Sequence, residues 1–183
     1  MKKYILIVDD EKDICLTLSK ILSSKGFSVT IADNSDTAIN EIKNASIDLV
    51  LLDVWLEGSK KNGLELLKIM RNYNPDTPVI LISGHANIDI AVKAIKEGAF
   101  YFIEKPFKSE KLFLIIDRAL ENAFLKKKYE IYKENLENDE EFIGNTVSIN
   151  NLKKKINQIA NTNARVLITG EPGTGKNFVA KLI

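Results

Sequence analysis

Three carboxylates, one hydroxyl and one ammonium group each follow a short apolar segment of this sequence. Asp9 and Asp10 follow the first segment, Asp53 follows a later one, and Ser83 and Lys105 follow two more. Each of these residues taken alone is more often structural, since aspartates also cap helices. Their joint occurrence after separate apolar segments indicates a functional site.

The residue types at this site favour one kind of chemistry. Carboxylates packed side by side repel one another, so their pKa values rise unless a cation neutralises them. Oxygen ligands without a nearby His or Cys cluster favour Mg²⁺, which commonly takes one or two carboxylates together with a phosphate oxygen. A carboxylate can attack a phosphoryl group to form an acyl phosphate, while a metal ion and a cation stabilise the transferred charge. The set therefore predicts Mg²⁺-dependent phosphoryl chemistry.

The apolar segments that must position these residues are typical of strands buried on both faces of a sheet. Segments 4–8, 48–52 and 78–82 are nearly continuous, whereas 27–31 alternates apolar and polar residues, as a strand near a sheet edge does. Strand and helix patterns alternate up to about residue 120, five of each. This order predicts a flavodoxin-like, doubly wound, five-stranded parallel sheet, in which ligands bind at the carboxyl ends of the strands. The five polar residues should then meet at one rim.

Helix signals fill the intervals between the expected strands. Gly26 follows the first helical pattern, and Gly98 follows the pattern at 88–97, so both glycines are expected to end helices. Ser109 is expected to begin the next helix, which includes Leu112.

Composition sets broad limits on function. The 183 residues include 26 Lys plus Arg and 25 Asp plus Glu, and the resulting net charge of +1 gives no overall field that favours nucleic acid or membrane. The single cysteine, Cys15, excludes a disulfide framework within the chain and favours the reducing cytosol. The apolar run after Met1 is too short for a signal segment or a membrane span, so we expect a cytoplasmic protein with no membrane partner.

Four short motifs resemble the receiver domain of bacterial two-component response regulators. They are Ile7-Val8-Asp9-Asp10-Glu11, Leu51-Leu52-Asp53, Ile82-Ser83-Gly84 and Glu104-Lys105-Pro106-Phe107, and the resemblance covers residues 1–121. It implies that a sensor histidine kinase phosphorylates Asp53 and that the Lys105-Pro106 bond is cis.

The resemblance also implies roles for the other residues of the site. Mg²⁺ would be bound by Asp10, Asp53 and the main-chain carbonyl of Trp55, with Asp9 supporting it through water. Lys105 would pair with a phosphoryl oxygen, and Ser83 would hydrogen-bond the same group. Phe102 would be the aromatic residue that changes rotamer on phosphorylation.

The segment 53–63 is longer than the usual receiver loop and lacks its proline. Together with Ser83-Gly84-His85-Ala86-Asn87-Ile88, it is similar to the NtrX branch of nitrogen-regulation response regulators, whose kinase would be NtrY-like. His85 is the single histidine, and a lone loop histidine is usually a surface residue. It is assigned no catalytic role.

A second segment follows residue 121. Residues 122–140 are expected to continue the helix as a linker, with either a short coiled-coil seam or a solvated surface; the seam would comprise Leu125, Tyr129, Tyr132 and Leu136. In 141–183, an expected buried strand at 166–169 leads into a phosphate-binding loop and a helix at 178–183. The loop residues are Gly170, Glu171, Pro172, Gly173, Thr174, Gly175, Lys176 and Asn177.

With Phe142-Ile143-Gly144, this second segment resembles the start of the AAA+ domain of sigma-54-dependent activators. Asn177 stands where many phosphate-binding loops have the Ser or Thr that binds Mg²⁺. The remaining parts of such a domain are expected to be absent, so ATP binding should be weak or missing. DNA and sigma-54 RNA polymerase would be contacted only through regions that this sequence lacks.

Three functions remain open on the sequence. The first is a phosphorylation-dependent regulatory switch that is not itself an enzyme and forms a homodimer through Ile95, Tyr101, Leu112 and Phe113. The second is a P-loop ATPase regulated by a receiver domain, and turnover of ATP would distinguish it from the regulatory switch. The third is a dimerising adaptor that ignores phosphorylation, which the acidic pocket disfavours.

Overall fold

The computed structural model describes residues 2–84, 88–138, 144, 146–160, 162 and 165–183 of the chain. Side chains are described over the same ranges except at 134–138. The chain divides into two compact units, residues 1–127 and 128–183, and each is described here by itself.

The first unit is built on a five-stranded parallel sheet. Its strands are β1 (Tyr4–Val8), β2 (Ser28–Ala32), β3 (Leu49–Asp53), β4 (Val79–Ser83) and β5 (Tyr101–Glu104). Their order in the sheet is β2-β1-β3-β4-β5, which confirms the doubly wound fold and places β2 at an edge as predicted. Because the order reverses between β1 and β3, a crevice opens beyond the carboxyl ends of these two neighbours.

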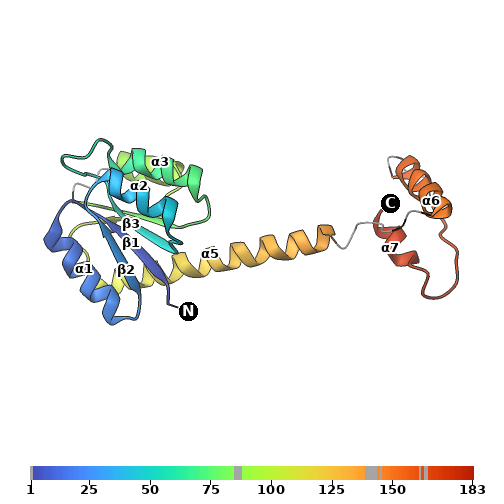
Figure 1. Ribbon diagram of the computed structural model, residues 1–183, viewed down its shortest axis with the longest axis horizontal. Coiled ribbons are helices and arrows are strands. Elements are labelled where there is room, and N and C mark those ends of the chain that lie inside the picture. Colours follow the sequence, from blue (N-terminus) through green and yellow to red (C-terminus); the bar gives the residue numbers. More distant parts are fainter. Residues whose placement is uncertain (1, 85–87, 139–143, 145, 161, 163–164) are drawn as a thin grey trace. The chain divides into compact units, whose positions relative to one another are not determined.

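Five helices cover the two faces of this sheet. They are α1 (Lys12–Ser24), α2 (Ser35–Asn44), α3 (Gly63–Tyr73), α4 (Ile88–Lys96) and α5 (Ser109–Asn138). Alternate strand residues point to opposite faces, so Leu6 and Leu52 pack with α2, α3 and α4, while Ile7 and Leu51 pack with α1 and α5. Figure 1 shows α2 and α3 on one side of the sheet and α1 on the other.

The helix boundaries follow local signals in the sequence. Gly26 and Gly98 adopt positive φ angles of 91° and 98° just after α1 and α4, as expected of helix-ending glycines. Asn62 begins α3 with a capping box, in which its side chain accepts from the Glu65 amide and the Glu65 carboxylate accepts from the Asn62 amide. The Lys105-Pro106 bond is cis, as predicted.

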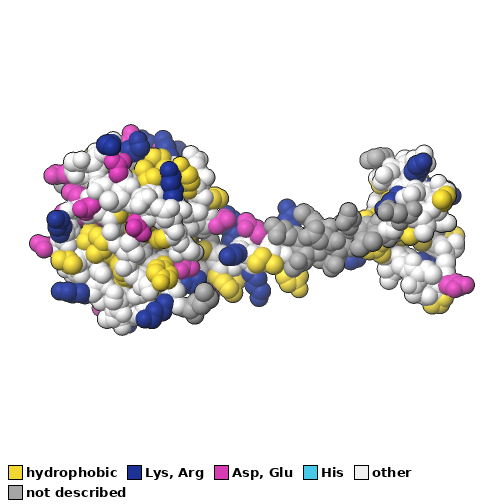
Figure 2. Space-filling model, in the orientation of Figure 1, with side chains coloured by type: hydrophobic (Ala, Val, Ile, Leu, Met, Phe, Trp, Pro, Cys, Tyr) yellow, Lys and Arg dark blue, Asp and Glu magenta, His cyan; other side chains and the backbone are white. Residues whose placement is uncertain are grey.

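The face of the first unit seen in Figure 2 carries charges of both signs, in agreement with the near-zero net charge of the chain. In the view of Figure 2, Lys and Arg side chains lie among Asp, Glu and hydrophobic side chains. Along the described parts of the chain, no helix combines the length and apolar character needed to cross a membrane.

The second unit contains helices α6 (Val147–Ile159) and α7 (Lys176–Lys181). The predicted continuation of α5 beyond residue 121 is confirmed, since this helix runs to Asn138. The predicted strand at 166–169 is wrong: these residues form no strand, and Leu167 is 87% exposed. A parallel strand needs neighbours that pair with its main-chain groups, and none lies among the described residues of this unit. Residues 142 and 143 of the predicted Phe142-Ile143-Gly144 motif, and the side chain of Leu136, lie outside what the structure describes.

Candidate functional site

The ends of four strands bring the site together. Asp9 follows β1, Asp53 and Ser83 are the last residues of β3 and β4, and Lys105 follows β5. The strands are in register at this rim, where Asp53 pairs with Ile82 across the sheet and the Lys105 amide donates to the Ser83 carbonyl at 2.8 Å. The side chains of Asp9, Asp53 and Ser83 are buried. Strand ends, rather than flexible loops, therefore fix the position of the reactive groups.

Lys105 links the carboxylates from different strands. Its Nζ atom lies 2.9 Å from Asp9 Oδ2, 2.9 Å from Asp53 Oδ1 and 3.5 Å from Glu11 Oε1. The other oxygen of Asp53 accepts a 2.7 Å hydrogen bond from the Trp55 amide. Both Asp53 oxygens are thus held, and the carboxylate has one orientation toward Lys105.

Burial and charge act in opposite directions on these groups. Burial raises the pKa of Asp53, and the hydrogen bond and positive charge of Lys105 offset this effect only in part. Burial by itself lowers the pKa of Lys105, but the hydrogen bonds with Asp9 and Asp53 outweigh it and hold the pKa above its ordinary value. Lys105 is therefore a cation at neutral pH, in a pocket where carboxylates outnumber it.

An open cleft of about 990 Å³ gives access to Asp53 and Lys105. Asp10, half-buried, lines this cleft, as does Trp55, whose side chain is 51% exposed. The cleft is bounded on one side by the β3–α3 loop, residues 54–62, and its lining residues are Asp10, Glu11, Asp53, Trp55, Leu56, Glu57, Ser59, Lys60, Asn62, Glu65, Gly84 and Lys105. A small anionic substrate can reach Asp53 from solvent through this opening.

The expected Mg²⁺ ligands can be compared with this geometry. In the ranges described, no group of three or more His, Cys, Asp or Glu side chains is placed to hold a metal ion. Asp9 and Asp53 instead contact Lys105. Asp10 and Asp53 nevertheless line the same cleft, and two carboxylates with open solvent are what Mg²⁺ commonly takes from a protein. The donor chemistry fits the metal, and the ligand set stays a prediction.

The proposed switch residues lie in different surroundings. Ser83 is fully buried at the end of β4, whereas Phe102 on β5 is half-buried and packs against the core beneath α2, α3 and α4. Ile95 and Tyr101 are exposed, as the predicted interface requires.

The prediction that Leu112 and Phe113 belong to this interface is wrong. Leu112 is 1% exposed and belongs to the core shared with α1, and Phe113 is half-buried with Lys25 Nζ 5.2 Å from its ring centroid. The phase of α5 turns both residues toward α1 rather than toward the surface formed by α4 and β5.

Sequence reasoning missed several residues of the cleft. Glu11 approaches Lys105 and Lys60 lines the cleft, although the sequence predicts no site role for either residue. The available signal was the apolar stretch Val54-Trp55-Leu56 at the start of the loop, of which Val54 and Leu56 are buried and anchor the loop to the core.

The predicted phosphate-binding loop lies in the second unit. Gly173 and Gly175 adopt positive φ angles of 82° and 81°, which suit a tight turn before α7. Lys176 Nζ donates to the carbonyl oxygens of Gly170 at 3.0 Å and Glu171 at 2.6 Å. Asn177 lies in the first turn of α7. The lysine is thus folded back onto its own loop.

Both parts of the chain match known protein families. The receiver domain family of response regulators matches residues 5–117, and the sigma-54 interaction domain family matches residues 143–183. The nitrogen assimilation regulatory protein NtrX of Azorhizobium caulinodans is 42% identical over 183 residues, which are 100% of this chain and 40% of that protein. The chain therefore spans about two fifths of the length of this curated relative.

Solved structures give the same likeness. A crystal structure of NtrX from Brucella abortus in complex with ATP superposes with a TM-score of 0.68 and 41% identity, covering 100% of this chain and 40% of that one. The solution structure of the beryllofluoride-activated NtrC4 receiver domain dimer gives a TM-score of 0.62 and 38% identity, covering 66% of this chain and 98% of that one. With the strand-end carboxylates and lysine in place, the chain belongs to the response regulators of two-component signalling and resembles the NtrX type, a receiver domain followed by a segment of sigma-54 interaction domain type.

Proposed function

We propose that Asp53 accepts a phosphoryl group from a sensor histidine kinase of the NtrY-like kind, and that Mg²⁺ is required. The observation that carries this proposal is the 2.9 Å contact between Lys105 Nζ and Asp53 Oδ1 at the floor of an open cleft. Mg²⁺ would be held by Asp10, Asp53 and the main-chain carbonyl of Trp55, with Asp9 supporting it through water. When bound, it would neutralise the oxygens of the transferred group.

The residues of the chain divide the remaining work among them. One carboxylate oxygen of Asp53 attacks the phosphorus as the bond to the donor breaks, and the donor leaves with the bonding electrons. Lys105, already a cation, stabilises the negative charge that develops on the phosphoryl oxygens. The Ser83 hydroxyl would donate to one of these oxygens, which couples the end of β4 to the phosphorylated state. Phe102 would follow by changing rotamer in the adjoining strand.

Labelling by a small phosphodonor tests this assignment. Acetyl phosphate with Mg²⁺ should add one phosphoryl group to the chain, detected by intact mass spectrometry, and Asp53→Asn should abolish the addition. Chelation of Mg²⁺ should abolish it as well. Labelling of Asp53→Asn at the level of the unsubstituted protein would remove Asp53 from this role.

The same proposal assigns parts to the rest of the chain. Residues 1–121 would form the receiver, 122–140 a helical linker and 141–183 the first part of a sigma-54 interaction domain. Contacts with DNA and sigma-54 RNA polymerase would belong to regions of the longer relatives outside this chain. The loop 170–177 would cradle phosphates only after Lys176 leaves its own loop carbonyls, so ATP binding by this segment alone would be weak.

Phosphorylation would act through a homodimer. The α4–β5 surface, defined as Ile88, Val92, Ile95 and Tyr101, exposes four apolar side chains, with Ile88 at 82% and the others between 41% and 49%. Phe102 packs beneath this surface against the core cluster that contains Ala94 of α4. A rotamer change at Phe102 could therefore alter the surface that a second copy contacts.

A further inference from the structure

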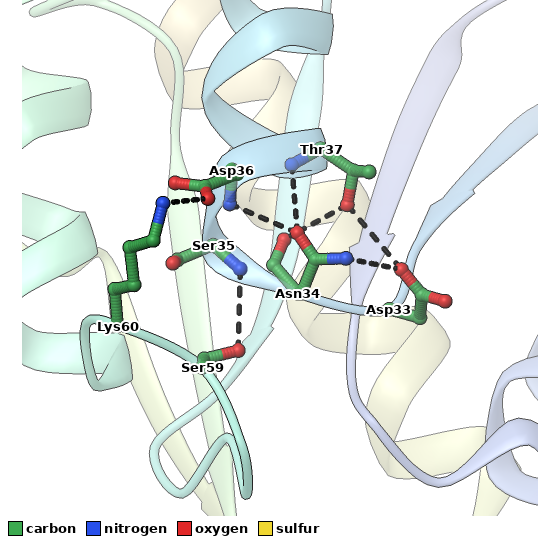
Figure 3. A network of polar contacts seen from close by, with 7 residues as sticks. All are labelled: Asp33, Asn34, Ser35, Asp36, Thr37, Ser59 and Lys60. Carbon is green, nitrogen blue, oxygen red and sulfur yellow. Dashed lines mark hydrogen bonds and ion pairs between the residues drawn. The ribbon is translucent and has the colours of Figure 1, made fainter.

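The β3–α3 loop carries a lysine at the mouth of the phosphoacceptor cleft. Lys60 lines the cleft together with Asp53, but its Nζ atom lies 2.7 Å from Asp36 Oδ2 in the first turn of α2. Figure 3 shows the Lys60 side chain reaching from the loop to Asp36. The ion pair raises the pKa of Lys60 above its ordinary value, so the side chain is charged.

The loop itself is anchored independently of this ion pair. Leu56 is buried in the core, Gly58 adopts a positive φ of 70°, and the Ser59 amide closes the turn onto the Leu56 carbonyl at 3.3 Å. Ser59 Oγ also accepts a hydrogen bond from the Ser35 amide at 3.3 Å (Figure 3). The main chain of Lys60 therefore stays in place when its ammonium group moves.

Asp36 is not needed to cap α2. The Asn34 side chain accepts from the Asp36 amide at 3.0 Å and from the Thr37 amide at 2.9 Å, which satisfies the first amides of the helix (Figure 3). The side chains of Lys60 and Asp36 are 78% and 60% exposed, and ion pairs at such exposure contribute little to stability. Their contact is thus easily exchanged for another.

The charge of the cleft supplies a reason for that exchange. Five acidic residues line it, namely Asp10, Glu11, Asp53, Glu57 and Glu65, against two cations, Lys60 and Lys105. Lys105 already forms ion pairs with Asp9 and Asp53 at the floor of the cleft. An anionic phosphodonor entering this cleft meets repulsion from these carboxylates, which a cation near the mouth reduces in addition to the proposed Mg²⁺.

We propose that Lys60 determines how well the cleft admits anionic phosphodonors, by exchanging Asp36 for the phosphoryl oxygens of the incoming donor. The inference rests on the proposed function of Asp53. With an acyl phosphate as donor, the phosphorus–oxygen bond to the acyl group breaks, a carboxylate leaves with the electron pair, and the new bond joins phosphorus to Asp53. Lys60 forms no bond in this step and is a specificity determinant, because it contacts the donor before transfer.

Phosphorylation kinetics with two donors test the inference. At low salt and fixed Mg²⁺, Lys60→Ala should lower the second-order rate constant for acetyl phosphate, a dianion, by roughly three- to tenfold. The loss should be smaller with phosphoramidate, which carries less net negative charge, and should fade at high salt. Lys60→Arg should stay within about twofold of the unsubstituted protein.

Two further variants separate this role from a structural one. Lys61→Ala makes the same change in net charge one residue away, outside the cleft lining, and should leave the rate within about twofold. Asp36→Asn keeps the Asn34 cap and frees Lys60, so it should raise the rate, by about twofold or more. The rate is followed by mass spectrometry, and circular dichroism melting checks that each variant is folded.

The outcomes distinguish this inference from the proposed function. If Lys60→Ala and Lys61→Ala react alike, or if Asp36→Asn slows the reaction as Lys60→Ala does, the ion pair is only a structural contact and the inference is wrong. Either result leaves the proposed function intact, provided that Asp53→Asn is not labelled. Absence of labelling in the unsubstituted protein would instead contradict the proposed function.

Discussion

At the scale of single residues, burial makes the charged form of the Asp53 carboxylate unfavourable, and the position of Asp53 in the site requires this burial. Asp53 is 6% exposed, and burial raises its pKa despite a lysine 2.9 Å away. Moving the carboxylate to solvent would relieve this cost but would also remove Asp53 from the rim where Lys105 and Asp9 meet. The pocket therefore holds excess negative charge that a metal ion, or neutralisation by substitution, would relieve.

This cost predicts a pH-dependent gain in stability for Asp53→Asn. A raised folded-state pKa means that the charged form of Asp53 opposes folding above that pKa, and that the penalty disappears as pH falls and the group protonates. Without Mg²⁺, the variant should be more stable than the unsubstituted protein by about 1 kcal/mol at pH 7. Urea unfolding followed by the fluorescence of Trp55, the single tryptophan, measures the difference.

The difference should shrink when the same unfolding experiment is repeated nearer pH 4. A gain that stays constant over this pH range would show that it does not come from the ionisation of Asp53. A loss of stability at pH 7 would show that the contact with Lys105 outweighs burial.

Residues at strand ends were predictable, and residues on the loops were not. Asp9, Asp53 and Lys105 could be placed because each follows an apolar segment, and parallel strands bring their carboxyl ends to one rim. Lys60 could not be placed, because its position depends on how the loop 54–62 folds over its anchor at Leu56. No periodic pattern in the sequence predicts the conformation of this loop.

At the scale of elements, strand predictions succeeded where the sheet supplies partners. The segments predicted as strands in the first unit agree with the structure to within a residue at each end, since continuous apolar runs are typical of buried parallel strands. The equally apolar segment 166–169 forms no strand, because pairing depends on neighbours rather than on its own residues. The wrong prediction for Leu112 and Phe113 has a similar cause, because the direction of these side chains depends on how α5 packs against α1.

The junction of β3 and α3 predicts a sharp contrast between two glycine substitutions. A Cβ atom at Gly63 would overlap the Asp53 carbonyl oxygen and lie 2.9 Å from Val54 Cα, and both are main-chain atoms that cannot rotate away. Gly63→Ala should therefore lower the free energy of unfolding by about 3 kcal/mol or more, and should slow labelling by displacing Asp53.

Gly26→Ala is the matched control. Its Cβ atom would meet nothing within 4 Å, so only the positive φ of 91° opposes the substitution, at a cost of about 1–2 kcal/mol. Urea unfolding of both variants, followed by Trp55 fluorescence, gives the comparison. Equal losses would mean that the backbone at the end of β3 yields more easily than the packing indicates.

At the scale of the whole chain, the two units have very different cores. Both faces of the sheet are covered in residues 1–127, whereas in the described part of 128–183 only Ile156 and Val179 are buried hydrophobic residues. Helix α5 belongs to both units and exposes Phe124, Leu125, Tyr129 and Tyr132 on its extension. Exposed apolar side chains on a helix of this length suit a contact with a second helix. The sequence predicted the helix, but the spacing of these residues alone did not distinguish such a contact from a solvated surface.

The proposed homodimer gives a prediction that involves the whole chain. Beryllofluoride with Mg²⁺ mimics the phosphorylated state, so its addition should shift the chain toward a dimer through the α4–β5 surface. Ile95→Lys places a charge on that surface, where Ile95 is 49% exposed and adds little to the core, so the variant should dimerise at least about tenfold more weakly. Its labelling on Asp53 by acetyl phosphate should be unchanged.

Sedimentation velocity over a wide concentration range, with and without beryllofluoride, measures this shift. Leu16→Lys is the matched control, because Leu16 is 53% exposed on α1, which packs on the opposite face of the sheet, and this variant should dimerise like the unsubstituted chain. Phe102→Ala should be labelled on Asp53 but should respond less to beryllofluoride, since Phe102 on β5 packs against the core cluster that contains Ala94 of α4. If the distributions with and without beryllofluoride coincide at every concentration, phosphorylation does not act through dimerisation, and equal weakening by Ile95→Lys and Leu16→Lys would place the interface elsewhere.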